Sequence, residues 1–159
     1  KDQEIDYTQD IIVALDDIQD PGNLGTILRT VDSIGLNQIL VSKETADSFN
    51  PKVVRSTMGA IFRVNIIESQ NLVKTLEELK TKKYEILVTA LEKAESIYNL
   101  ELKNKIIVIG NEANGVSKEV FDIADKKMTI PMLGKTESLN ASVATGVILY
   151  EYVRRKLIK

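Results

Sequence analysis

Short runs of apolar residues alternate along the chain with stretches whose apolar residues repeat at helical spacing. Continuous apolar runs of about four to eight residues between turn residues are typical of strands that are buried on both faces. Such runs predict six strands, at 11–15, 39–41, 63–67, 85–90, 105–110 and 128–130. Because helical segments separate these runs, the sequence predicts one α/β domain in which helices cover both faces of a mostly parallel sheet.

The helical segments are identified by their apolar faces and by the residues at their ends. Leu24, Leu28 and Val31 share one face of a helix for which Asn23 is a candidate N-cap. Arg29 is expected on the opposite face, where it is free to point at a ligand. Ser138 and Asn140 are both candidate caps of the last helix, because their side-chain oxygens can accept from its unpaired N–H groups. The other helices are expected at 52–58 after Pro51, at 72–79, at 118–124 with Ser117 as cap, and at 140–156.

The last predicted helix has two apolar stripes. The first comprises Val143, Gly146, Val147, Tyr150, Val153 and Leu157, and the second comprises Ala141, Ala144, Ile148 and Tyr152. A helix that is apolar nearly all round is buried on two sides. One side can pack on its own sheet, whereas the other is covered either by the rest of a monomer core or by a second copy of the chain. We expect a homodimer contact.

Composition narrows the class of protein. The 159 residues, of which 43% are hydrophobic and 28% charged, suit one soluble globular domain. No apolar run is long enough to span a membrane, and the chain does not start with a signal-peptide pattern. Cysteine is absent, so the chain forms no disulfides. Histidine is absent as well, which removes the commonest general base, and the lack of both residues argues against a zinc site. A cytoplasmic location is compatible with this composition and is expected.

The charge balance gives no basic footprint of a stand-alone nucleic-acid binder, because the net charge is −2. If the substrate is nucleic acid, the electrostatic attraction must be local or supplied from elsewhere. The chain begins at Lys1 without a methionine, which suggests a fragment or a processed product. Residues 1–10 are interpreted as a leader or linker before a single domain.

Three segments rich in glycine, asparagine and serine follow predicted strands, at 20–29, 110–115 and 130–140. In open α/β sheets, ligands bind beyond the carboxyl ends of strands, so we expect these segments to form one site. Neither a G-x-G-x-x-G fingerprint nor a G-x-x-x-x-G-K-[ST] phosphate loop is present. Gly22 and Gly25 are nevertheless expected to leave free N–H groups at a helix start, where an anion could bind.

Taken together, these segments resemble the three motifs of the SpoU/TrmH family of RNA 2′-O-ribose methyltransferases, in the SPOUT superfamily. The first motif is matched by Asp20, Pro21, Asn23, Gly25 and Arg29. The second is matched by Gly110, Asn111, Glu112, Gly115 and Val116, and the third by Ile130, Pro131, Met132 and residues 138–144. Ala113 and Ala141 replace residues that are common in the family. The resemblance covers nearly the whole chain from about Ile11 onward.

The resemblance implies a SPOUT α/β knot, in which the C-terminal segment forms a deep trefoil knot that holds S-adenosylmethionine without a metal. It also implies homodimers with the last helix in the interface. Family members often carry an N-terminal RNA-recognition domain, for which this chain has no room. The implied cofactor-binding residues are Thr89, Ala90, Gly110, Asn111, Ile130, Met132, Ser138 and Leu139. The implied catalytic and substrate-binding residues are Arg29, Asn23, Glu112, Ser138 and Asn140.

The expected reaction is methyl transfer to a ribose 2′-hydroxyl of structured RNA, with ribosomal RNA preferred to transfer RNA on family grounds only. Arg29 is expected to stabilise the developing alkoxide and to bind the adjacent phosphate. Three alternatives stay open at this point. The chain could be a non-catalytic RNA-binding module with the same fold, a SPOUT enzyme that methylates a base nitrogen, or a generic nucleotide-binding domain, which the absent phosphate fingerprints disfavour.

Overall fold

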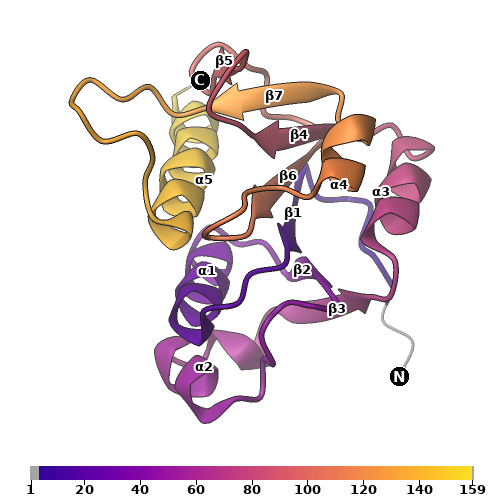
Figure 1. Ribbon diagram of the computed structural model, residues 1–159. Helices are drawn as coiled ribbons and strands as arrows, with labels where there is room; N and C mark the ends of the chain where they lie inside the picture. Colours follow the sequence, from indigo (N-terminus) through magenta and orange to yellow (C-terminus); the bar gives the residue numbers. More distant parts are fainter. Residues whose placement is uncertain (1–3, 159) are drawn as a thin grey trace.

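Within residues 4–158, which the computed structural model describes, seven strands form one sheet in the order β3-β2-β1-β6-β4-β7-β5 (Figure 1). The strands are β1 (Ile11–Asp16), β2 (Gln38–Ser42), β3 (Asn65–Ser69), β4 (Glu85–Thr89), β5 (Glu95–Ser96), β6 (Lys105–Gly110) and β7 (Lys126–Thr129). Neighbouring strands are parallel throughout, so the predicted parallel sheet is confirmed. The trefoil knot stays a prediction.

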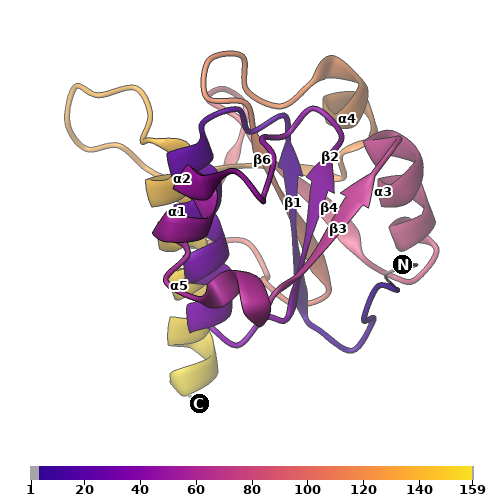
Figure 2. The same cartoon turned by 90° about the horizontal axis from the view of Figure 1, so that it is seen from below.

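Helices cover both faces of this sheet, as the alternation of elements predicted (Figures 1 and 2). They are α1 (Pro21–Ser33), α2 (Pro51–Ser56), the 3-10 helix η1 (Ala60–Phe62), α3 (Leu72–Lys80), α4 (Lys118–Ile123) and α5 (Ala141–Leu157). Helices α1, α2 and α5 lie on one face, and α3 and α4 lie on the other. No helix in the described part of the chain is both long enough and apolar enough to cross a membrane.

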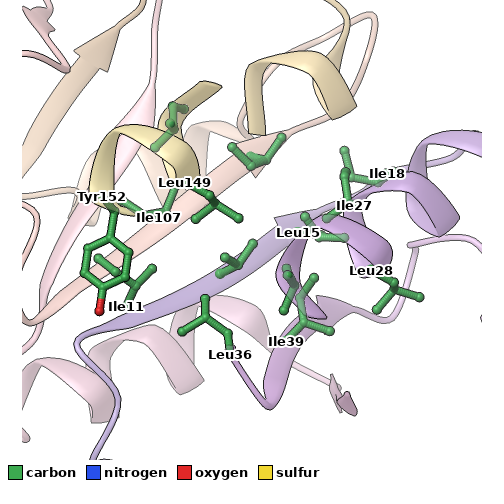
Figure 3. Close-up of a cluster of buried hydrophobic side chains, with 14 of the residues drawn as sticks. Ile11, Leu15, Ile18, Ile27, Leu28, Leu36, Ile39, Ile107, Leu149 and Tyr152 are labelled. Carbon is green, nitrogen blue, oxygen red and sulfur yellow. The ribbon is translucent and has the colours of Figure 1, made fainter. Parts of the chain in front are cut away.

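The core has one layer on each side of the sheet because the central strands are buried on both faces. Figure 3 shows the layer in which Leu15 of β1 lies among side chains of α1 and α5, such as Ile27 and Leu149. The opposite layer contains residues of the same strand with the other parity, such as Ile12, together with Leu76 of α3. This double burial is the reason that the strands appear in the sequence as continuous apolar runs.

Two strand predictions needed correction, and one strand was missed. Strand β3 starts at Asn65 instead of residue 63, because η1 occupies residues 60–62 and Arg63 still belongs to its final turn. Strand β7 covers residues 126–129 instead of 128–130. The two-residue strand β5 was not predicted, since Glu95 and Ser96 form no apolar run and pair only with β7 at the sheet edge.

The cap predicted for α1 is wrong. Asp20 caps the helix, with its Oδ1 accepting from the Gly22 N–H at 2.8 Å, and Asn23 lies inside the first turn. The predicted anion site at this helix start is therefore wrong as well, because a carboxylate already takes the Gly22 N–H. Gly25 serves close packing instead, since a Cβ atom there would lie 1.8 Å from the Ser56 Oγ of α2.

Helix α5 has one buried and one exposed stripe. Ile148 and Tyr152 of the second predicted stripe are buried against the sheet. In the first stripe, Val143 and Tyr150 are each 50% exposed and Leu157 is 79% exposed. The interpretation of α5 as the centre of a monomer core is therefore wrong, whereas the homodimer contact stays a prediction.

Part of the predicted leader contacts the sheet. The Asp6 N–H donates to the Gln38 side-chain oxygen at 2.8 Å, and the Gln38 amide donates to the Asp6 carbonyl at 2.7 Å. The Tyr84 hydroxyl donates to the carbonyl of Gln9 at 2.6 Å. Residues 1–3 of the predicted leader lie outside the described residues.

Candidate active site

A cavity of about 510 Å³ opens beyond the carboxyl ends of β4, β6 and β7. The loops that follow these strands and the first turns of α5 form its walls. All eight residues that the sequence implied for cofactor binding line it: Thr89, Ala90, Gly110, Asn111, Ile130, Met132, Ser138 and Leu139. The long loop at residues 130–140 projects from the body of the domain beside the start of α5 (Figures 1 and 2).

Asn111 fixes the loop at the end of β6. Its backbone N–H and C=O pair with those of Gly115 at 3.0 and 2.9 Å. Its side-chain oxygen accepts from the N–H groups of Ala113 and Asn114, both at 2.9 Å. Its side-chain amide donates to the Asp17 carbonyl at 2.8 Å, which attaches the loop to the end of β1. Since every polar atom of Asn111 is engaged in this way, its role in the loop is to hold backbone in place.

Gly110 lies where this loop folds back onto the strand. A Cβ atom on Gly110 would lie 2.2 Å from the backbone nitrogen of Val116 and 2.3 Å from the carbonyl carbon of Gly115. Real side chains do not approach backbone so closely, so this cavity wall requires a glycine. Gly115 has φ +71°, a left-handed conformation that glycine adopts without strain.

Glu112 joins the second motif to the first. One carboxylate oxygen accepts from the Gln19 N–H at 3.1 Å. The other accepts from the Asp20 N–H at 2.9 Å and from the Asn23 side-chain amide at 3.1 Å. Partial desolvation of the Glu112 carboxylate by itself raises its pKa, but the hydrogen bonds from Asp20, Asn23 and Gln19 outweigh this effect and lower the pKa below its ordinary value, although the residue as a whole is exposed. The carboxylate is thus held ionised between two motifs that are about ninety residues apart in the sequence.

Replacement of Glu112 by glutamine should lower the free energy of unfolding by about 0.5–1 kcal/mol, because an amide has one acceptor oxygen for three donors and because water screens the contacts of a residue this exposed. The depressed pKa means that the wild-type contribution is present above the unfolded value of 4.5 and is lost as the pH falls through the lower folded value. Urea unfolding at neutral and acidic pH measures both effects. Glu101→Gln, at an exposed loop position, is the control. Equal stability of Glu112→Gln and wild type across this range would contradict the assignment.

The other predicted catalytic residues lie at different distances from the cavity. Ser138 lines it. Asn140 does not line it, and instead caps α5 by accepting from the N–H groups of Ser142 at 2.8 Å and Val143 at 3.4 Å. The structure therefore selects Asn140 over Ser138 as the cap of this helix.

Arg29 lies outside the cavity of its own chain. It is exposed on α1, on the side away from the buried face, as the helical spacing predicted. One turn further along α1, Ser33 and the Tyr150 hydroxyl of α5 are 3.1 Å apart and share a hydrogen bond. Arg29 thus lies on the surface that α1 shares with the exposed stripe of α5.

Two carboxylates at the cavity were missed in the sequence. Glu92 follows β4 and Glu137 lies in the loop after β7, and both line the cavity. Their position in loops after strand ends could have identified them in the sequence, because acidic residues there can bind hydroxyl or ammonium groups of a ligand.

Known proteins similar to this chain are RNA methyltransferases. A sequence profile of the SpoU rRNA methylase family matches residues 10–150. A protein of Staphylococcus aureus (strain COL) described as a TrmH family tRNA/rRNA methyltransferase is 38% identical over 146 residues, which are 91% of this chain and 59% of that protein. The 23S rRNA (guanosine(2553)-2′-O)-methyltransferase RlmP of Bacillus subtilis is 34% identical over 140 residues, which are 87% of this chain and 56% of that protein.

A solved structure shares the fold. The SpoU methyltransferase AviRb from Streptomyces viridochromogenes, in complex with the cofactor AdoMet, matches with a TM-score of 0.85 and 28% identity. The match covers 93% of this chain and 61% of AviRb. The chain thus spans less than two thirds of the length of each of these three proteins.

Proposed function

The chain belongs to the SpoU rRNA methylase family, and on this premise we propose that it transfers a methyl group from S-adenosylmethionine to a ribose 2′-hydroxyl of RNA. The observation that carries the proposal is the cavity at the strand ends, where the second and third motifs meet and Glu112 holds the first motif beside them. Ribosomal RNA is the proposed substrate in preference to transfer RNA, which agrees with the name of the Bacillus subtilis relative.

The cavity suits S-adenosylmethionine in size and chemistry. Its volume of about 510 Å³ is within the roughly 300–1,000 Å³ of small-molecule sites. The apolar side chains of Ile130, Met132 and Leu139 provide a surface for the adenine ring. Glu92 and Glu137 provide acceptors for ribose hydroxyls and the ammonium group. When bound, the cofactor supplies a methyl group on a positively charged sulfur.

The absence of histidine is compatible with this reaction. Holding two reactants in line is worth about 7–11 kcal/mol, whereas a general base contributes roughly 10²–10⁴-fold in rate. An arginine guanidinium stays protonated in proteins and cannot act as that base. We propose that Arg29 stabilises the alkoxide that develops on the ribose and binds the adjacent phosphate through two N–H groups. The proton of the 2′-hydroxyl passes to solvent water as its oxygen takes the methyl group. Because Arg29 is exposed on α1, it would contact RNA that is bound across this helix.

The remaining motif residues would position these groups. Asn23 and Glu112 are proposed to hold the start of α1, and with it Arg29, against the loop at the end of β6. Asn140 would fix the start of α5, and Ser138 would contact the cofactor from the loop at residues 130–140.

A homodimer through the exposed stripe of α5 is also proposed. Val143 and Tyr150, each 50% exposed, leave apolar surface uncovered beside Arg29 and Ser33 of α1. A second copy seated on this stripe would border Arg29. Sedimentation equilibrium of the purified chain tests the proposal, and a monomer at all protein concentrations would exclude it.

Transfer of a tritiated methyl group to bulk ribosomal or transfer RNA tests the reaction. Digestion of the labelled RNA to nucleosides is expected to place the label on ribose. Label on a base would identify a base-methylating enzyme of the same fold. RNA binding without transfer, with S-adenosylmethionine present at saturation, would identify a non-catalytic RNA-binding module.

A further inference from the structure

The segment at residues 48–63 differs in charge from the rest of the chain. It contains Lys52, Arg55 and Arg63 and no acidic residue, whereas the whole chain has a net charge of −2. It forms the loop before α2, helix α2 and η1. Helix α2 packs on the start of α1, where Asp20, Asn23 and Glu112 meet, whereas Arg63 after η1 pairs with Asp32 near the other end of α1. A local basic surface is what an acidic domain needs in order to attract a polyanion.

Two of the three phenylalanines of the chain lie in this segment and are exposed. Phe49 is 79% exposed and Phe62 is 87% exposed. Both line a second cavity, of about 640 Å³, which lies along β3 and beside the carboxyl end of β2. Because these rings are so exposed, they contribute little to the core. Their placement together at this second cavity, called the hollow below, indicates a ligand with a flat apolar face.

The backbone that carries these rings is held in place. The Phe49 N–H donates to the Asp47 carboxylate at 2.9 Å, and the Asn50 side chain caps α2 by accepting from the Lys52 N–H at 2.9 Å. Between α2 and η1, Met58 has φ 52°, a left-handed conformation that costs energy in a residue other than glycine. The rings are thus presented on a fixed and locally strained scaffold, which lowers the entropic cost of binding.

The charges divide between the hollow and helix α2. Two cations, Lys43 and Arg63, and two carboxylates, Asp47 and Glu68, line the hollow, and Arg63 also pairs at 2.8 Å with Asp32 of α1. The hollow is therefore close to neutral and suits an uncharged base. On α2, Lys52 and Arg55 form no ion pair within residues 4–158, so they remain available for phosphates.

Lys52 connects this surface to the candidate active site. A Cβ atom on Gly22 would lie 3.9 Å from the Lys52 Cε, so the lysine side chain lies over the start of α1. The Gly22 N–H donates to the Asp20 carboxylate, and the Asp20 N–H donates to the Glu112 carboxylate. A strand that crosses α2 is thereby directed to the mouth of the cavity at the strand ends.

We propose that the face formed by Phe49, Lys52, Arg55 and Phe62 binds an unpaired strand of the RNA substrate next to the modified nucleotide. The rings stack on bases at the hollow, and the two cations contact phosphates. The strand is unpaired because bases within a duplex are stacked on their neighbours and cannot offer their faces to a side chain. This inference rests on the proposed function for the identity of the substrate.

Fluorescence anisotropy with a labelled, unstructured RNA of about 12 nucleotides tests it, a length within the roughly 4–16 nucleotides of single-strand sites. Phe49→Ala and Phe62→Ala should each weaken binding by roughly 5- to 100-fold. Phe62→Trp keeps an aromatic ring at this position and should bind the RNA about as tightly as wild type. Tyr98→Ala, at an aromatic residue that is 55% exposed and follows β5 at the far sheet edge, should bind like wild type. A duplex of the same length should bind more weakly than the single strand.

The inference is overturned if the wild-type chain does not bind the single strand, or if both alanine variants bind it like wild type. It is also overturned if these variants change only the sedimentation of the chain, since the face would then be a protein contact. Methyl transfer by the wild-type chain is measured in parallel. If the wild-type chain transfers methyl groups and the alanine variants bind the RNA like wild type, this inference alone is refuted. If binding depends on the rings but the wild-type chain transfers no methyl group, the proposed function alone is refuted.

Discussion

Replacement of Arg29 by alanine is expected to lower the rate of methyl transfer by about 100-fold or more, the usual cost of removing a group that stabilises developing negative charge. The affinity for S-adenosylmethionine should stay within a few-fold of wild type, because Arg29 does not line the cavity. The fold should be unaffected, since the side chain is exposed. Single-turnover transfer to ribosomal RNA and calorimetry with the cofactor measure the two quantities separately.

Two further variants sharpen this result. Arg29→Lys keeps the charge but loses the planar pair of donors, so it should recover only part of the rate. Lys118→Ala removes an exposed cation from α4, on the opposite face of the sheet, and should transfer methyl groups like wild type. A parallel loss of cofactor binding in Arg29→Ala would show that the arginine is structural. Unchanged transfer would remove it from the mechanism.

The central strands were predictable because burial on both faces leaves continuous apolar runs in the sequence, as in 11–15 and 105–110. Strand β5 was not predictable, because Glu95 and Ser96 are defined only by backbone pairing with β7. Edge strands of this length depend on the neighbouring strand being in place and carry no side-chain pattern of their own.

The candidate site was predictable where it depends on strand ends and unpredictable where it depends on contacts between distant residues. The segments at 110–115 and 130–140 follow β6 and β7, which run parallel and are separated only by β4, so the topology brings both segments to the same cavity. Asn23 was misjudged as a helix cap because its partner, Glu112, lies 89 positions away and no local pattern indicates that contact. The exposure of Arg29 followed from helical spacing, but its position outside the cavity did not.

Replacement of Gly110 by alanine is expected to abolish cofactor binding and to destabilise the domain by at least about 1–3 kcal/mol, the usual cost of overpacking. The added Cβ would lie 2.2 Å from the Val116 nitrogen, so the strand or the loop must move. The loop cannot move without losing bonds, because the Ser117 N–H binds the Asp16 carboxylate at 2.7 Å and Asn111 binds the Asp17 carbonyl. Calorimetry with S-adenosylmethionine and thermal unfolding measure the two effects.

Gly134→Ala is the matched control for this variant. Gly134 lies in the projecting loop at residues 130–140, and a Cβ atom there would meet no atom within 4 Å. The same change of one methyl group should therefore leave both stability and cofactor affinity near wild type. If Gly110→Ala also bound the cofactor like wild type, the cavity would not depend on the fold of the second motif. The placement of S-adenosylmethionine at the end of β6 would then be wrong. Gly110 ends β6 and Gly134 lies in the loop after β7, so a difference between the two variants is expected to come from the close contacts of Gly110 with Gly115 and Val116.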